Sequence, residues 1–325
     1  QLQDALHSTL RNGEDPETAI RFFHRAQILR TAWRDLCNLA DIQLITEELS
    51  DLADVIIQAV FDLIWKRLAA SHGEPGSNES GLPARMAVIA LGKLGGRELN
   101  FSSDIDLMFV YDNQGTTLGG SCSPIENKKF FTLLAQGTCD FLGRCSTNGF
   151  LYRVDTRLRP EGERGELAVT LSAIEIYYHS YGQNWERQSL LKARPAAGSP
   201  DVGRQFLQLI TPFTYRKYVD EVEIAEVLRS IDGLRRKSLA AIGSFEQQAV
   251  NFKNGYGGIR DIEFFVQAVQ MLYGGQYPEI KLAGTLLSLQ RMHESHLLHS
   301  REYEFLTAAY KFLRRIEHRL QMAAD

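Results

Sequence analysis

The chain has 325 residues, more than one typical domain, so two or three domains with sizeable cores are expected. Hydrophobic residues make up 44% and charged residues 23% of the sequence, and these ordinary values exclude wholesale disorder and a fibrous repeat. A net charge of −4 excludes bulk binding to nucleic acid or to an anionic membrane, so any phosphate chemistry must rely on local positive charge.

The N-terminal part of the chain is predicted to be helical. Asp15 and Pro16 are typical of an N-cap followed by proline at the first helical position. An apolar stripe then recurs at helical spacing, and we expect its aromatic-rich face to lie in the core; its members are Phe22, Phe23, Ala26, Leu29, Trp33 and Leu36. A second stripe predicts a helix from Ile45 to about Leu68. The polar segment 71–83 is expected to be the first domain boundary.

The centre of the chain changes to a β pattern. Met86–Leu91 and Ile105–Tyr111 are predicted to be two strands on either side of a glycine-rich turn, and Phe150–Leu158 a third strand. The remaining elements are predicted helices at 126–142, 172–181, 185–193, 206–210, 222–239, 259–273, 286–297 and 302–322. The fold class is therefore α+β and mostly helical. The expected domains are an N-terminal helical segment at 1–81, an α/β domain at 82–211 and a C-terminal helical bundle at 212–325.

Several absences narrow the compartment. No apolar run reaches the length of a membrane span, and the N-terminus has no signal-peptide pattern. The four cysteines contain no CxxC pair, which argues against a zinc site or a disulfide framework. We therefore expect a cytoplasmic protein. The sequence also lacks an initiator Met and stops at Asp325 just after a strongly helical stretch, from which we expect a fragment of a longer polypeptide.

The most informative stretch joins the first two predicted strands. Asp104 and Asp106 are two apart, so on a strand their carboxylates share one face, and a hard cation would relieve their repulsion. Magnesium prefers oxygen ligands and keeps phosphate oxygens in its shell, so this pair suits metal-assisted phosphoryl or nucleotidyl transfer. Gly95 and Gly96 would let backbone N–H groups approach a phosphate, and Ser102 or Ser103 would add a hydroxyl contact.

A plainer interpretation exists for the same stretch. The two aspartates would simply end a strand in solvent, and the double glycine would be a tight turn. The preceding buried strand and the following apolar strand favour the functional interpretation. The P-loop and G-x-G-x-x-G patterns are both missing, which excludes the common nucleotide-binding motifs.

The sequence Gly92-Lys-Leu-Gly-Gly-Arg-Glu-Leu-Asn-Phe-Ser-Ser-Asp-Ile-Asp-Leu107 resembles the signature of the glutamine synthetase adenylyltransferase/adenylyl-removing enzyme family. That family belongs to the DNA polymerase β-like nucleotidyltransferase superfamily. Segments 154–162, 185–195 and 257–264 are similar to the family's other motifs and occur in the same order. The resemblance implies a polymerase β-like α/β core with N-terminal helices and a C-terminal helical bundle.

A two-metal site needs a third acidic ligand, and Asp155 in the third predicted strand is the candidate, as the resemblance also implies. The alternative is an ion pair of Asp155 with Arg153 or Arg157. Arg157 and Arg159 follow at a period of two and would share a face with Asp155 if the strand continues. Their guanidinium groups suit the AMP phosphate or an incoming anion, although exposed arginines often bind nothing.

Further basic residues lie on or beside the helix predicted at 185–193. The resemblance suggests that Lys192 and Arg194 approach the nucleotide cleft, while a salt-bridged, solvated helix face is equally compatible with their spacing. Arg187 and Arg194 are seven apart and would lie on one side of that helix. The glycines before Ile259 would let a helix N-terminus face an anion, or Asp261 and Glu263 would only complement the helix dipole.

The resemblance also implies the reaction. The family's full-length protein is similar to two fused copies of such a unit, and the motifs here, including Arg314-Arg-Ile-Glu-His-Arg-Leu-Gln-Met322, look more like the N-terminal, adenylyl-removing half. The expected reaction is Mg²⁺-dependent phosphorolysis with two metal ions, in which phosphate and tyrosyl-AMP on glutamine synthetase give ADP and tyrosine. The alternatives are the adenylylating reaction with ATP and a non-catalytic module that binds the PII signalling protein.

Overall fold

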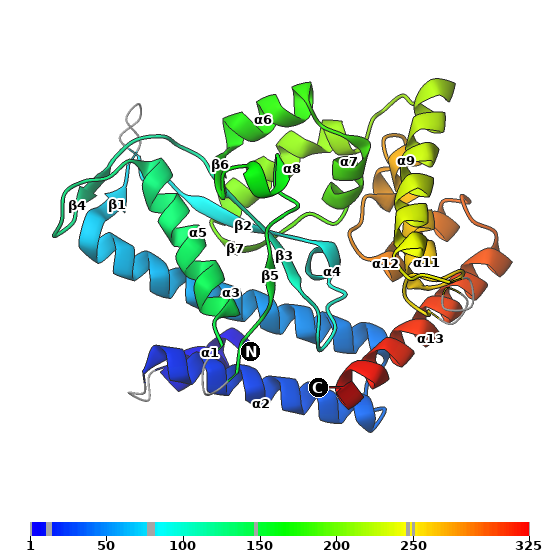
Figure 1. The fold of residues 1–325 in the computed structure, drawn as a ribbon, viewed down its shortest axis with the longest axis horizontal. Helices are drawn as coiled ribbons and strands as arrows, with labels where there is room; N and C mark the ends of the chain where they lie inside the picture. Colours follow the sequence, from blue (N-terminus) through cyan, green and yellow to red (C-terminus); the bar gives the residue numbers. More distant parts are fainter. Residues whose placement is uncertain are drawn as a thin grey trace. The chain divides into compact units, whose positions relative to one another are not determined.

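The computed structural model describes residues 2–10, 15–76, 82–145, 149–244, 248 and 251–324 (Figure 1). Its contacts divide the chain into two compact units, each of which draws on several segments. The first unit holds Gln1–Leu99, Ser103–Ser180 and Ala193–Leu209, and the second holds Asn100–Ser102, Tyr181–Lys192 and Ile210–Asp325. The N-terminal helices and the sheet thus share one unit, and the division at 1–81, 82–211 and 212–325 stays a prediction.

Three helices open the first unit: α1 (Leu2–Leu10), α2 (Pro16–Leu36) and α3 (Ile42–His72). The predicted start of α2 is confirmed, because the Asp15 carboxylate accepts a hydrogen bond of 3.1 Å from the Thr18 N–H. Asp41 caps α3 in the same way, accepting 2.9 Å from the Leu44 N–H. The predicted second helix is confirmed and is longer than expected at both ends.

The apolar stripe predicted to bury α2 is in part wrong. Phe22, Leu29, Trp33 and Leu36 are 66%, 71%, 64% and 54% exposed, whereas Ala19, Ile20 and Phe23 are buried. Neighbouring residues in a helix are about 100° apart, so Phe22 and Phe23 belong to different faces. The helix turns the face of Ile20 and Phe23 inward and leaves the longer stripe outside.

A five-stranded sheet lies in the first unit, with strand order β5-β3-β2-β7 and β6 also paired with β3. The strands are β2 (Met86–Leu91), β3 (Ile105–Tyr111), β5 (Val154–Asp155), β6 (Ala168–Thr170) and β7 (Arg194–Gly198). The two central strands are confirmed at the predicted bounds, and both are almost wholly buried. The third strand predicted at Phe150–Leu158 shrinks to the two residues of β5, and β6 and β7 were not predicted.

Helices cover this sheet and extend the first unit. They are α4 (Gly92–Gly95), α5 (Asn127–Gly143), α6 (Leu171–Ser180) and α8 (Pro200–Thr214), whose last residues belong to the second unit. α3 packs against α5 and β7, which places its buried face beside the sheet (Figure 1). Two short strands, β1 (Gly73–Pro75) and β4 (Thr117–Gly119), form a separate antiparallel pair. Part of the predicted linker 71–83 is therefore ordered structure, while 77–81 lie outside the described residues.

The second unit is helical, as predicted. Its helices are α7 (Asn184–Leu190), α9 (Glu221–Ala240), α11 (Ile259–Tyr273), α12 (Thr285–Glu294) and α13 (Ser300–Ala324). Short 3-10 turns lie at Gly162–Arg164 in the first unit and Pro278–Ile280 in the second. The larger core of the second unit is formed by α11, α12 and α13 around Val266, Leu289 and Tyr310. Within the described ranges, no helix combines the length and apolar character that crossing a membrane requires.

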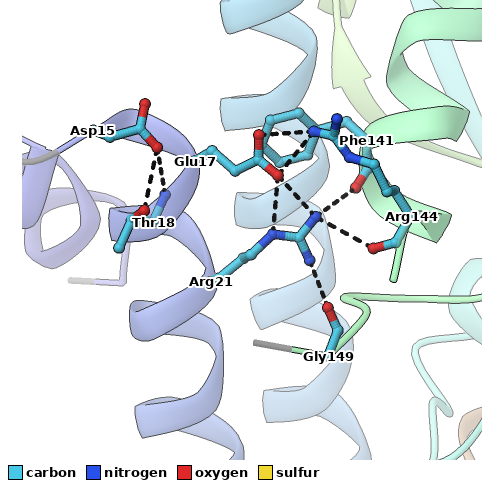
Figure 2. A network of polar contacts seen from close by, with 7 residues as sticks. All are labelled: Asp15, Glu17, Thr18, Arg21, Phe141, Arg144 and Gly149. Carbon is cyan, nitrogen blue, oxygen red and sulfur yellow. Dashed lines mark hydrogen bonds and ion pairs between the residues drawn. The ribbon is translucent and has the colours of Figure 1, made fainter. Parts of the chain in front are cut away.

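A buried arginine ties α2 to the C-terminal end of α5 (Figure 2). Arg21 is 2% exposed and donates to the carbonyl oxygens of Phe141 (3.3 Å), Arg144 (3.3 Å) and Gly149 (2.9 Å). Glu17 accepts from Arg21 at 3.1 Å and from Arg144 at 2.7 Å, so the buried charge is compensated. These bonds satisfy carbonyl groups that the end of α5 leaves without helical partners.

We expect the Arg21→Met variant to lower the free energy of unfolding by about 3 kcal/mol, because it leaves buried carbonyl groups and Glu17 without their shared partner. Urea denaturation followed by circular dichroism measures this loss. Arg144→Met is the matched control. This variant removes Arg144, the second arginine that binds Glu17. The Arg144 side chain is 56% exposed, so we expect the free energy of unfolding to fall by less than about 1 kcal/mol. Equal losses in the two variants would contradict the assigned role of Arg21.

Candidate functional site

Two of the predicted acidic residues lie side by side on the sheet. β3 and β5 run parallel, with Ile105 opposite Val154 and Asp106 opposite Asp155. Residues in register on neighbouring strands carry their side chains on the same face, and their backbones are about 4.8 Å apart. The short strand β5 therefore brings together two carboxylates that are far apart in the sequence.

The other side of Asp106 faces the end of β2. Leu91, the last residue of β2, is the register partner of Asp106, and Gly92 follows directly. The backbone of Gly92 has a φ of 53°, in the left-handed region that favours glycine. A Cβ atom on Gly92 would lie 2.1 Å from the Oδ2 atom of Asp106, closer than real atoms approach. Gly92 thus provides the space that the Asp106 carboxylate occupies.

Gly95 and Gly96, which are predicted to let backbone N–H groups approach a phosphate, lie in the turn that Gly92 opens. Gly96 has an ordinary helical conformation, with a φ of −72°, and its N–H group donates to the Gly92 carbonyl at 3.1 Å. That donor is therefore used inside the turn. The place of Gly92 beside Asp106 follows from the register of Leu91 with Asp106. That register is a property of strand pairing and not of the local sequence, so the sequence alone did not predict it.

The first predicted aspartate lies just outside the strand. Asp104 directly precedes β3 and is half exposed. Its Oδ1 atom accepts a hydrogen bond of 2.5 Å from the Arg153 Nε. β3 begins at Ile105, so Asp104 lies one residue before the strand, and the common face of Asp104 and Asp106 stays a prediction. Arg153 belongs to the segment leading into β5, so the ion pair ties the starts of these two neighbouring strands.

Asp155 has an arginine partner of its own. The Arg157 guanidinium donates to both carboxylate oxygens, with Nε 3.1 Å from Oδ1 and 3.0 Å from Oδ2, and the Arg157 N–H adds a bond of 2.8 Å to Oδ1. The Arg157 side-chain hydrogen bonds lower the pKa of Asp155 below its usual value of 3.8, against the opposing effect of partial burial. Asp155 is therefore a carboxylate throughout the neutral range.

We expect the Arg157→Gln variant to raise the pKa of Asp155 toward 3.8, measured by NMR titration of the carboxyl carbon. A carboxyl whose pKa is lowered by folding contributes stability above its unfolded pKa and loses it as pH falls through the folded value. The variant should therefore show a weaker loss of stability under acid. Arg164→Gln removes a positive charge from the same loop and is the control. An unchanged Asp155 titration in Arg157→Gln would contradict the assignment.

The two arginines expected to share a face with Asp155 separate, because β5 ends at Asp155. Arg157 remains exposed, with 67% of its side chain accessible. Arg159 is buried and donates to the carbonyl oxygens of Thr156 (2.7 Å), Glu163 (3.1 Å) and Gly165 (3.2 Å). Arg159 thus holds the loop after β5 together, whereas Arg157 is exposed and bound to Asp155.

Lys192 and Arg194 both lie beyond the end of α7 at Leu190 and fall in different units. Lys192, in the second unit, is buried and its Nζ lies 3.6 Å from the Glu263 Oε1 of α11. Arg194, in the first unit, opens β7 and forms an ion pair with Asp54 of α3. The predicted common helix side of Arg187 and Arg194 is therefore wrong: Arg187 is buried against Glu223 at 3.0 Å, and burial lowers its pKa to about 10.

The glycine-rich approach to α11 is closed by protein groups. Asp261 accepts from the Gly257 N–H at 3.0 Å and from Arg235 Nε and Nη2 at 2.8 and 2.9 Å. Burial acts to raise the pKa of Asp261, but the bonds from Arg235 and Gly257 outweigh it and lower that pKa. Asp261 therefore caps the first turn of α11, which was the plainer of the two predicted alternatives.

The serine segment before Asp104 is held by α13 within the second unit. The Ser102 N–H donates to the Gln321 Oε1 at 3.3 Å, and Ser103 belongs to the first unit. The Asn100 Oδ1 atom meets two buried side chains of α13, the Arg314 guanidinium and the His318 Nε2 at 3.1 Å. These contacts of Arg314 and His318 were not predicted from the sequence. The feature that could have indicated them is the cluster of charged residues among the apolar positions of the segment Arg314–Met322.

The donor chemistry of the site fits a hard divalent cation, because Asp104, Asp106 and Asp155 all offer carboxylate oxygens. Only Asp106 and Asp155 are register partners, and Asp104 and Asp155 are each paired with an arginine. Over the described ranges, no three His, Cys, Asp or Glu side chains gather in an arrangement suited to a metal ion.

An α/β core with a glycine-led turn and paired strand carboxylates is the arrangement expected of the nucleotidyltransferase class, in which carboxylates hold the metal that assists the transfer. A family model described as glutamate-ammonia ligase adenylyltransferase matches residues 1–209, and one described as GlnD PII-uridylyltransferase matches residues 232–325. The chain belongs to the glutamate-ammonia ligase adenylyltransferase family.

Two curated relatives carry the name bifunctional glutamine synthetase adenylyltransferase/adenylyl-removing enzyme. The protein from Hahella chejuensis is 38% identical over 324 residues, covering 100% of this chain and 33% of its own length. The protein from Thioalkalivibrio sulfidiphilus is 39% identical over 306 residues, covering 94% of this chain and 31% of its own length. The chain thus spans about a third of the length of these relatives.

Proposed function

We propose that this chain removes AMP from an adenylylated tyrosine of glutamine synthetase by phosphorolysis. The observation that carries the proposal is the register pair Asp106 and Asp155, beside the Gly92 turn. The printed names of the relatives supply the protein substrate, and the motif resemblance to the N-terminal half supplies the direction. The proposed setting is the cytoplasm, where the reaction would regulate nitrogen assimilation.

We assign the metal role to Asp104, Asp106 and Asp155, with two Mg²⁺ ions. The metal would supply positive charge at the transferred phosphate and at the departing oxygen. Asp104 and Asp155 pair with Arg153 and Arg157 in the structure, so cation binding would replace these ion pairs. In the structure each of the two arginines offsets the charge of the carboxylate that it binds.

The chemistry requires little from the protein as a base. Orthophosphate is anionic near neutral pH, so one of its oxygens attacks the α-phosphorus directly. The bond from that phosphorus to the tyrosine oxygen breaks, and the departing phenolate, whose phenol has an ordinary pKa near 10, takes up the proton that hydrogen phosphate loses, giving ADP and tyrosine. Arg157 is the exposed guanidinium beside the carboxylates and is assigned to the phosphate.

The remaining candidates for nucleotide contact are Gly95, Gly96, Ser102, Ser103, Arg159, Lys192 and Arg194. Arg159 and Arg194 are bound to protein groups of the first unit, so their contribution would be to shape the backbone around the site. Lys192 is bound to Glu263 within the second unit. Gly95 and Gly96 would act through the backbone of the turn that follows β2.

A second function is favoured by one specific observation. Residues 232–325 match a family model named for PII-uridylyltransferase, which favours a role of the second unit in signalling through the PII protein. The adenylylating reaction, in which AMP passes from ATP to glutamine synthetase, uses the same site chemistry. Phosphorolysis is favoured over the PII-binding role and the adenylylating reaction because the motifs resemble the adenylyl-removing half.

Two reaction mixtures distinguish these functions. The first offers adenylylated glutamine synthetase with Mg²⁺ and phosphate, and the second offers unmodified glutamine synthetase with Mg²⁺ and ATP. ADP in the first mixture is the expected result. Pyrophosphate in the second mixture alone would support the adenylylating reaction, and no product in either, together with binding of PII by calorimetry, would support the regulatory module.

A further inference from the structure

Three polar residues of α3 meet the turn that follows β2. Asp54 follows Ser50 by four positions and Asp51 by three, so the three side chains lie within about 100° of one another around the helix. Ser50 is buried, and its hydroxyl accepts a hydrogen bond of 3.2 Å from the Leu99 N–H. The Asp51 carboxylate accepts a hydrogen bond of 2.5 Å from the Arg97 guanidinium. Both bonds hold the end of the turn at residues 92–99, and all of these residues belong to the first unit.

The third residue, Asp54, reaches the start of the same turn through Arg194. The Arg194 guanidinium makes a bidentate pair with Asp54, with Nη1 2.6 Å from Oδ2 and Nη2 2.9 Å from Oδ1. Arg194 Nη2 also donates to the Leu94 carbonyl at 3.1 Å, inside α4. The two side chains are 21% and 19% exposed, so this is a largely buried pair.

The turn needs such support because its backbone is strained. Gly92 and Arg97 both have left-handed φ angles, of 53° and 56°. This conformation is unfavourable for a residue with a Cβ atom, such as Arg97, and persists only where surrounding contacts hold it. Inside the turn, the Glu98 N–H donates to the Lys93 carbonyl at 2.8 Å, but the ends are fixed from α3.

We propose that Asp54 and Arg194 are positioning residues, which hold the turn at residues 92–99 so that Gly92 leaves the Asp106 carboxylate its place. The inference rests on the proposed function, because it concerns the same site. It replaces the expected contact of Arg194 with the nucleotide by a contact with the backbone of Leu94. It also makes the N-terminal helix α3 part of the working site.

The test compares variants of the 325-residue chain. Asp54→Asn keeps the size of the side chain but loses its charge, and Arg194→Lys keeps the charge but loses the planar fork. Glu48→Gln is the matched control, because Glu48 is also a half-buried carboxylate of α3 paired with an arginine, Arg34. Hydrogen exchange of the peptide covering residues 92–99 is followed by mass spectrometry, together with the thermal midpoint, kcat and KM for phosphate.

We expect exchange at residues 92–99 to accelerate about tenfold in Asp54→Asn and Arg194→Lys and to stay at the wild-type rate in Glu48→Gln. We expect kcat to fall about 10²-fold in the first two variants, because the reacting groups lose their alignment, with a smaller change in KM. The double variant should lose little more than either single one, since both act on one contact.

Unchanged exchange at residues 92–99 in Asp54→Asn, or equal acceleration in Glu48→Gln, would overturn the inference. An inactive wild-type chain in both reaction mixtures would instead overturn the proposed function. The exchange experiment needs no substrate, so it still decides whether Asp54 and Arg194 hold the turn.

Discussion

Replacing Asp106 by asparagine should lower the rate of AMP removal by about 10³-fold. The substitution keeps the shape of the side chain but removes the negative charge that lies between Asp155 and the Gly92 turn. A metal site supplies several kcal/mol of charge stabilisation in the transition state, and each 1.36 kcal/mol is a tenfold change in rate. ADP release from adenylylated glutamine synthetase with Mg²⁺ and phosphate measures the effect.

Asp112→Asn is the control for this experiment. Asp112 directly follows the other end of β3, and its Oδ1 accepts 2.8 Å from the Arg85 N–H, a bond that asparagine also makes. We expect this variant to keep the wild-type rate and thermal midpoint. Asp104→Asn and Asp155→Asn should behave like Asp106→Asn. Half or more of the wild-type rate in Asp106→Asn would remove Asp106 from the proposed mechanism.

The second large effect is expected for Gly92→Ala. The new Cβ would lie 2.1 Å from the Asp106 Oδ2, so the carboxylate or the turn must move. The left-handed backbone adds a cost of about 1–2 kcal/mol for a residue with a Cβ atom. We therefore expect AMP removal to fall about 10²-fold or more, since displacing a reacting group by about 1 Å costs that much. Thermal denaturation measures the loss of stability, and the ADP assay measures the loss of AMP removal.

Gly119→Ala separates backbone strain from displacement of the carboxylate. Gly119 has a φ of 88°, and a Cβ atom there would meet nothing within 4 Å. Its variant should lose stability to a similar extent while it retains AMP removal. If Gly119→Ala and Gly92→Ala lose activity equally, the role of Gly92 is general stability and not the placement of Asp106.

Local sequence signals predicted the long elements well. The strands Met86–Leu91 and Ile105–Tyr111 and the helix Ile259–Tyr273 have the predicted bounds, because each is marked by a continuous apolar run or a clear 3.6-residue period. Short edge strands carry no such signal. β5 has two residues and β6 has three, and their existence depends on pairing with β3 rather than on their own composition.

The sequence by itself determined the family, the mostly helical α+β class and three of the acidic candidates, because these depend on residue types at fixed spacing. The tertiary structure alone decided which groups meet. Strand register placed Asp155 beside Asp106, and it set Gly92 against the Asp106 carboxylate. The buried Arg159 binds carbonyl groups of the loop after β5. Arg194 pairs with Asp54 and binds the Leu94 carbonyl of α4. The decisive pairings are non-local, since Asp54 and Arg194 are 140 positions apart and Asp155 meets Asp106 only through the pairing of two separate strands, and no pattern along one segment contains them.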